Sequence, residues 1–256
     1  MNTMLIIGHP GHEIRCHGWM SRHRPVVHVL TSGGGASKEG RTESTRKTVE
    51  GAGARCGRLF GSFADQEIYA FMLKGEAGPL ATWAESIASE IAGCSPTTII
   101  TDMVEGYNSS HDLLAYLVDA ALTKAAEHGG FRPKVLCQPL MGRPDQAWQG
   151  RLKPTDILTL DEDAYAAKLD AAGAYPELKS EVEHALRESG PDAFRTEAYY
   201  ETPRGETLLT TLPDPKPYYE TFGEEQVRRG KYAHVIRHQE HLLPLARAVR
   251  RRMGLG

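Results

Sequence analysis

The first 140 residues alternate between short apolar runs and amphipathic segments. Apolar or β-branched runs, typical of buried strands, lie at 4–7, 25–30, 57–63, 97–101 and 134–138. Apolar residues at helical spacing predict helices at 45–54, 81–92 and 111–127. Strands that alternate with helices of about ten or more residues indicate a parallel sheet with helices on both faces. The pattern therefore predicts an α/β fold, a three-layer sandwich with a mainly parallel sheet.

The pattern changes after about residue 140. Prolines and polar residues become more frequent, and helical spacing occurs at 162–172, 178–189 and 232–253. A loop-rich stretch at 202–219 includes Pro217-Tyr218-Tyr219, which could line a pocket. We therefore predict a core at 1–140 and a C-terminal helical and loop cap at 141–256, packed on the core as a single globular unit.

Composition argues against several classes of function. The net charge of −3 over 256 residues predicts no basic surface for nucleic acid or for an anionic membrane. No stretch approaches the roughly 18 apolar residues that a membrane span needs. The four cysteines are scattered without a CxxC pair, which is typical of a reducing compartment. We expect a cytoplasmic protein, and whether it forms a homo-oligomer stays open.

Histidines follow two of the predicted strands. His9 and His12 come directly after the first apolar run, and His111 opens the helix that follows the run at 97–101. Ligands of open α/β sheets lie beyond the carboxyl ends of the strands, so these side chains are expected at one sheet edge. Three imidazoles with an open fourth position are typical of a catalytic zinc site. The alternative is that they are ordinary surface or helix-terminal histidines.

Several segments resemble, in order and spacing, the motifs of the LmbE-like or PIG-L family of zinc-dependent N-acetylglucosamine deacetylases. His9-Pro10-Gly11-His12-Glu13 is similar to the family's His-Pro-Asp-Asp-Glu signature. Asn108 and His111 stand where the family has the two histidines of a later His-x-x-His segment. Residues 30–37 resemble its glycine-rich loop, and residues 64–69 lie where it has a Pro-Asp-Gly-like segment. The resemblance covers about the first 140 residues.

The resemblance implies both a function and a set of site residues. It implies a Rossmann-like fold, one zinc ion, and hydrolysis of an N-acyl bond, usually acetyl, on an amino sugar or glycoconjugate. The metal ligands would be His9, His12 and His111, and Arg41 would contact the substrate. The partner would therefore be a small-molecule or glycoconjugate substrate.

Two positions depart from the family's pattern. Gly11 replaces the aspartate that acts as general base, and His12 replaces the aspartate that binds the metal. Loss of a general base ordinarily costs about 10²–10⁴ in rate. A neutral ligand in place of an anionic one leaves the centre about one charge unit more positive, which favours a lower pKa for water at the metal.

Other residues could then assist the chemistry. Glu13 and Asp112 are candidates for proton transfer, and the Asn108 amide could donate a hydrogen bond to an oxyanion. His238, in the last predicted helix, could contact the substrate. Two alternatives stay open: a degenerate member that binds metal or glycan without hydrolysis, and a deacylase of a small acylated metabolite. A dinucleotide site and a serine hydrolase are not favoured, because no GxGxxG or Gly-x-Ser-x-Gly pattern occurs.

Overall fold

The computed structural model describes residues 2–35, 40–127, 132–201 and 203–255. At its centre is a five-stranded parallel sheet in the order β3-β2-β1-β4-β5. The strands are β1 (Thr3–Ile7), β2 (Val26–Thr31), β3 (Arg55–Phe63), β4 (Thr98–Asp102) and β5 (Lys134–Gln138). The predicted α/β fold with a parallel sheet is confirmed.

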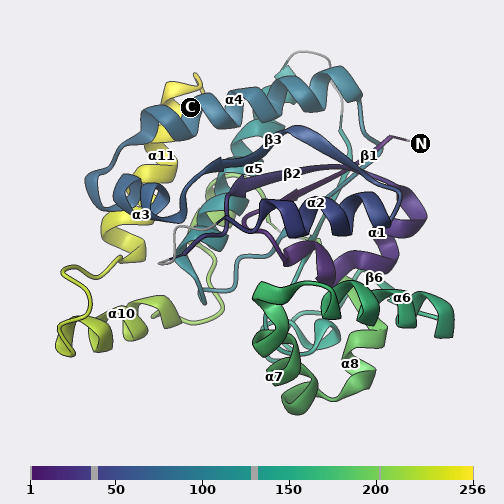
Figure 1. Ribbon diagram of the computed structural model, residues 1–256. Helices are drawn as coiled ribbons and strands as arrows, with labels where there is room; N and C mark the ends of the chain where they lie inside the picture. The colour runs from purple at the N-terminus through teal and green to yellow at the C-terminus, as the bar shows by residue number, and fades with distance from the viewer. Residues whose placement is uncertain (1, 36–39, 128–131, 202, 256) are drawn as a thin grey trace.

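Helices cover both faces of the sheet (Figure 1). Met4 and Ile6 of β1 enter the larger core, whereas Leu5 and Ile7 enter a second core on the opposite face. All of β1 is buried, as expected for a central strand covered on both sides. The larger core includes α3 (Asp65–Lys74), α4 (Ala77–Cys94), α5 (Ser109–Glu127) and α11 (Leu243–Arg252). The second core includes α1 (His17–His23) and α2 (Thr42–Gly51).

Residues 144–199 form a cap beside the second face of the sheet, green in Figure 1. Its elements are η2 (Pro144–Gln146), β6 (Asp156–Thr159), α6 (Glu162–Gly173), η3 (Pro176–Leu178), α7 (Lys179–Ser189), α8 (Pro191–Arg195) and β7 (Thr196–Tyr199), with β6 and β7 antiparallel. A buried ion pair, Lys168 Nζ to Glu197 Oε1 at 2.9 Å, lies where the cap meets the core. Glu197 also accepts hydrogen bonds from the backbone of Gly18 and Trp19 at the start of α1.

The C-terminal segment returns to the larger core. It comprises α9 (Glu206–Thr210), α10 (Tyr218–Arg228), a π-helical turn η4 (His238–Leu242) and α11. A single helix over 232–253 was expected, but residues 232–237 are not helical. Helical structure begins at His238 instead. The backbone N–H of Arg237, the residue before it, donates to His241 Nδ1.

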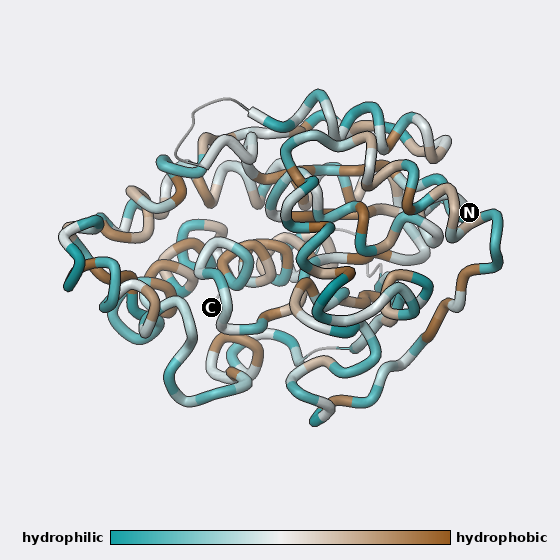
Figure 2. Tube along the Cα trace, turned by 60° about the horizontal axis from the view of Figure 1, so that its bottom comes forward, coloured by the Kyte–Doolittle hydropathy of each residue, from teal (hydrophilic) through white to brown (hydrophobic). Residues whose placement is uncertain are grey.

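The buried residues are mainly hydrophobic, and hydrophilic stretches alternate with hydrophobic ones along the chain (Figure 2). Among the described residues, no helix is both long enough and apolar enough to cross a bilayer.

Candidate metal centre

The three candidate histidines lie at the point where the strand order reverses. In this order, β1 and β4 are neighbours whose helices pack on different faces, and ligands of such folds lie in the crevice beyond them. His9 and His12 follow β1, and His111 lies in the first turn of α5, after β4. Gly8 joins the two strand ends, because its N–H donates to Asp102 Oδ2 at 2.7 Å.

The structure brings the three imidazole rings together. The ring centres of His9 and His12 are 5.3 Å apart, and those of His9 and His111 are 5.0 Å apart. His12 and His111 are separated by 4.5 Å. Zinc–nitrogen bonds of about 2.1 Å in a tetrahedral arrangement place ligand ring centres about 5 Å apart. The spacing of this imidazole cluster therefore suits one shared cation.

Buried carboxylates hold two of the rings. His12 Nδ1 lies 2.7 Å from Asp102 Oδ2, so the Nδ1–H donates to the carboxylate and Nε2 is the atom left for another partner. His9 Nδ1 lies 2.9 Å from Asp65 Oδ1, at the first residue of α3. Carboxylates in this position behind a histidine are the usual support of metal-binding imidazoles. Sequence reasoning missed the roles of both aspartates.

Electrostatics keeps the cluster suited to binding a cation. Burial lowers the pKa of His111 well below its usual value, and the nearby His12 and His9 lower it further. Burial also lowers the pKa of His9, although the hydrogen bond with Asp65 opposes this. Burial by itself would raise the pKa of Asp65, but the His9 contact outweighs it and the pKa is lowered. Neutral imidazole is the form that binds a metal.

The nitrogen atoms themselves do not surround a common point. Among the described residues, no group of three or more His, Cys, Asp or Glu side chains has its donors placed to hold a metal ion. His9 shows one reason, because its Nε2 lies 2.7 Å from Ser110 Oγ. The residue types, ring spacing and supporting carboxylates fit a divalent metal, but binding through His9 Nε2 requires this contact to break.

Ser110, His9 and Asp65 are connected in the order of a hydrolytic triad. Ser110 is only 1% exposed, however, so a substrate has no access to its hydroxyl. Its Oγ also lies 2.8 Å from Asn108 Oδ1. We therefore infer that these contacts hold the His9 ring in place. The hydroxyl of Thr31, 2.7 Å from His9 Nδ1, also holds this ring.

Gly11 has a conformation and a neighbour that both favour glycine. Its φ is +104°, a value that L side chains rarely adopt. A Cβ atom added at Gly11 would lie 2.5 Å from Leu178 Cδ1. Leu178 belongs to η3 of the cap, so the cap fills the space beside Gly11. In the family that the sequence resembles, this position carries the general base.

The two carboxylates predicted to move protons lie inside the protein. Glu13 is fully buried and its Oε2 accepts from the Gly11 N–H at 2.7 Å. Asp112 is fully buried and accepts from the backbone of Glu105 and Gly106. Burial raises the pKa of each side chain to about 7. These contacts give both carboxylates a structural role in the turns that carry the imidazoles.

Asn108 lies just before α5, and Arg41 lies just before α2. Asn108 Oδ1 accepts from Ser110 N at 3.0 Å near the start of α5, which leaves its amide nitrogen as the group that can donate to a ligand. Arg41 lies 3.8 Å from Glu181 of α7, so it reaches from the core to the cap. Residues 36 and 37 of the glycine-rich segment lie outside the described residues.

His238 is held in the C-terminal segment. It is 1% exposed, its Nε2 lies 3.0 Å from Leu209 O, and its ring packs against Tyr116. Its backbone N–H donates to Glu220 Oε1. These contacts support the fold, and none of them involves the imidazole cluster.

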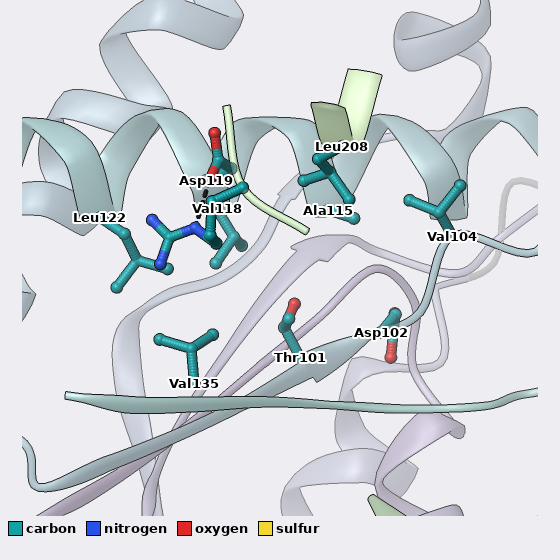
Figure 3. Close-up of a pocket in the computed structure, with 10 residues that line it drawn as sticks. Thr101, Asp102, Val104, Ala115, Val118, Asp119, Leu122, Val135 and Leu208 are labelled. Carbon is teal, nitrogen blue, oxygen red and sulfur yellow. Dashed lines mark hydrogen bonds and ion pairs between the residues drawn. The ribbon is translucent and has the colours of Figure 1, made fainter. Parts of the chain in front are cut away.

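A small cavity lies behind the cluster, with Asp102 at one end and Asp119 farther along (Figure 3). Its volume is about 10 Å³. That is room for about one water molecule, so it is too small for a substrate.

Solved structures with a similar fold include the zinc-inhibited form of teicoplanin deacetylase Orf2, with a TM-score of 0.51 and 11% identity. A deacetylase–teicoplanin complex gives a TM-score of 0.52 and 12% identity. Both matches cover 80% of this chain and 99% of the other. The A40926 pseudoaglycone deacetylase Dbv21 gives 0.49 and 18% identity, over 79% of this chain and 97% of the other. No protein-family model and no curated protein matches the chain.

The chain has the fold of the teicoplanin deacetylase. At 11–12% identity, this likeness extends to the fold alone. The match covers 80% of a chain whose centre is a five-stranded parallel sheet with helices on both faces, the α/β fold that the sequence predicted.

Proposed function

We propose that this protein is a metal-dependent deacetylase that removes an N-acyl group from an amino sugar or glycoconjugate. One observation carries the proposal: three imidazoles, with ring centres 4.5–5.3 Å apart, meet at the strand-order reversal of a fold shared with a deacetylase. His9, His12 and His111 would hold the metal, zinc being the ion that such a donor set suits. When bound, the metal would polarise the acyl carbonyl and lower the pKa of water.

The protein's own groups would position the reactants. Asp102 accepts from His12 Nδ1 and so keeps the Nε2 of that ring available to a ligand. The Asn108 amide would donate a hydrogen bond to the developing oxyanion, a contribution that typically costs 10²–10³ in rate when removed. Arg41 and the cap would contact the part of the substrate away from the acyl group.

One observation favours a second candidate, a protein that binds metal or glycan without hydrolysis. Gly11 offers no carboxylate, and Leu178 lies against it. Glu13 and Asp112 are fully buried, so neither takes over as a base in this conformation.

Metal titration and turnover distinguish the candidates. Calorimetry with Zn²⁺ would compare the wild type with the His12→Ala and His111→Ala variants, and with His234→Ala, an exposed histidine, as the matched control. Acetate release from N-acetylglucosamine derivatives would be measured with and without metal. Metal-dependent release supports the deacetylase, whereas binding without release supports the second candidate. Wild-type affinity in both cluster variants would refute the metal centre.

A further inference from the structure

Four exposed aromatic side chains form a continuous row on the surface. Tyr107 and Tyr218 stack with ring centres 5.1 Å apart and an interplanar angle of 5°. Phe222 follows at 6.0 Å from Tyr218, and Tyr232 lies 6.3 Å from Phe222. Each side chain is between 41% and 52% exposed. Exposed apolar groups gathered in one place, rather than scattered, mark binding surfaces.

The row is held rigidly from behind. Tyr218 and Phe222 are four residues apart on α10, so they share one face of that helix. Tyr219, between them, is buried, and its N–H donates to Gly106 O at 3.3 Å. The helix is therefore anchored by one face to the loop after β4 while it presents the aromatic rings to solvent.

One end of the row adjoins the imidazole cluster. Tyr107 immediately precedes Asn108, whose Oδ1 contacts Ser110, and His111 follows in the same turn. Tyr69, on α3, lies with its hydroxyl 3.5 Å from Asn108 Oδ1. The first aromatic ring thus belongs to the loop that positions the third imidazole.

The other end of the row adjoins a groove. Tyr232 precedes residues 233–235, which line a groove of about 650 Å³ together with Ala70 and Leu73 of α3. Pockets of about 300–1,000 Å³ are typical for small ligands. Helix α3 begins at Asp65, the partner of His9, and its residues Ala70 and Leu73 line the groove, so the imidazole cluster and the groove border the same helix.

The chemistry of the row selects its ligand. Several charged groups around α10 pair with one another, since Lys216 and Arg237 both contact Glu224. The row itself exposes aromatic side chains, which attract rings that have an apolar face. Pyranose rings of an oligosaccharide and aromatic rings of an aglycone both meet this requirement.

We propose that the aromatic row, Tyr107–Tyr218–Phe222–Tyr232, is an extended subsite that stacks on the ring portion of a glycoconjugate whose N-acyl group lies at the imidazole cluster. The inference rests on the proposed function for the orientation of the substrate. Stacking itself requires neither metal nor turnover, so it can be measured separately.

Calorimetry on the full chain without added metal tests the subsite with three probes. N-acetylglucosamine is the single-ring reference, chitotetraose extends it with pyranose rings, and 4-nitrophenyl N-acetylglucosaminide extends it with an aromatic ring. We expect at least one extended probe to bind about fivefold or more tightly than the reference. Tyr218→Leu and Phe222→Leu should remove this gain, and Tyr218→Phe should keep it. Ile157→Ala, at a site 51% exposed on β6, is the control expected to match the wild type.

Several outcomes would overturn the subsite. These are equal binding of all three probes by the wild type, an undiminished gain in Tyr218→Leu, or an equal loss in Ile157→Ala. Sedimentation provides a further test, because a wild-type dimer that becomes monomeric in Tyr218→Leu would make the row an interface between copies. If the gain disappears as expected but no probe is ever hydrolysed with metal, the subsite stands and the proposed hydrolysis fails.

Discussion

Replacing Gly11 with alanine tests how closely the cap packs on the turn between the first two histidines. The backbone there has φ +104°, and an added Cβ atom would lie 2.5 Å from Leu178 Cδ1. A non-glycine residue in a sparsely populated backbone region costs about 1–3 kcal/mol. Overpacking by one methyl group costs about 1–3 kcal/mol more. We expect Gly11→Ala to lower the free energy of unfolding by about 3 kcal/mol.

A double-mutant cycle separates the two costs. Leu178→Ala removes the methyl groups that an alanine at position 11 would meet, so only the backbone cost remains in the double variant. The double variant should therefore be more stable than the sum of the two single changes predicts, by about 1–3 kcal/mol. Aspartate at position 11 meets the same obstacle, so Gly11→Asp should also be destabilised.

Urea unfolding followed by circular dichroism measures all these variants. Gly93→Ala is the matched control, because Gly93 lies in α4, has no positive φ, and has nothing within 4 Å of an added Cβ. It should gain about 0.5–1 kcal/mol. If Gly11→Ala were as stable as the wild type, or if the cycle showed no coupling, the proposed packing of the cap on this turn would be wrong.

Three further predictions concern other buried groups. Burial lowers the pKa of His28 from 6.5 to about 4, so the unfolded chain binds more protons between these values and stability falls as pH drops from 6.5 to 4. Urea unfolding should show this loss, about 3 kcal/mol relative to His28→Leu, and a pH-independent difference would contradict it. Lys168→Met leaves Glu197 without its cation and should lower the free energy of unfolding by about 3–5 kcal/mol. A loss below about 1 kcal/mol would contradict a buried ion pair at this site. Asp102→Asn should weaken Zn²⁺ binding in calorimetry about 10–100-fold by releasing the His12 ring, and unchanged affinity would exclude this role.

Most of the central sheet could be predicted from the sequence. The apolar runs at 4–7, 25–30, 97–101 and 134–138 match β1, β2, β4 and β5 within one residue at each end. They succeed because strands buried on both faces need continuous apolar residues. Helix α10 was missed because its buried positions include Glu220, Gly223 and Gln226, which give no apolar period.

The imidazole cluster was also foreseeable, whereas its supports were not. His9, His12 and His111 each follow a strand end, a local feature that sequence reveals. Asp102 reaches a ring 90 residues away, and the contact depends on how β1 and β4 pair. The obstruction by Leu178 at Gly11 depends on how the cap folds back, which no local pattern encodes.

The two strands that precede the histidines, β1 and β4, are both inner strands of the sheet, and the cap supplies none of the three rings. Under the proposed function, the three cation-binding rings come from the core, whereas much of the proposed recognition surface lies on α10 and the cap. We therefore expect that substitutions on α10 or within the cap change which molecule binds, while the geometry of the imidazole cluster is kept. In such an arrangement, the peripheral elements can change without any change in the strands and turns that hold the three imidazoles.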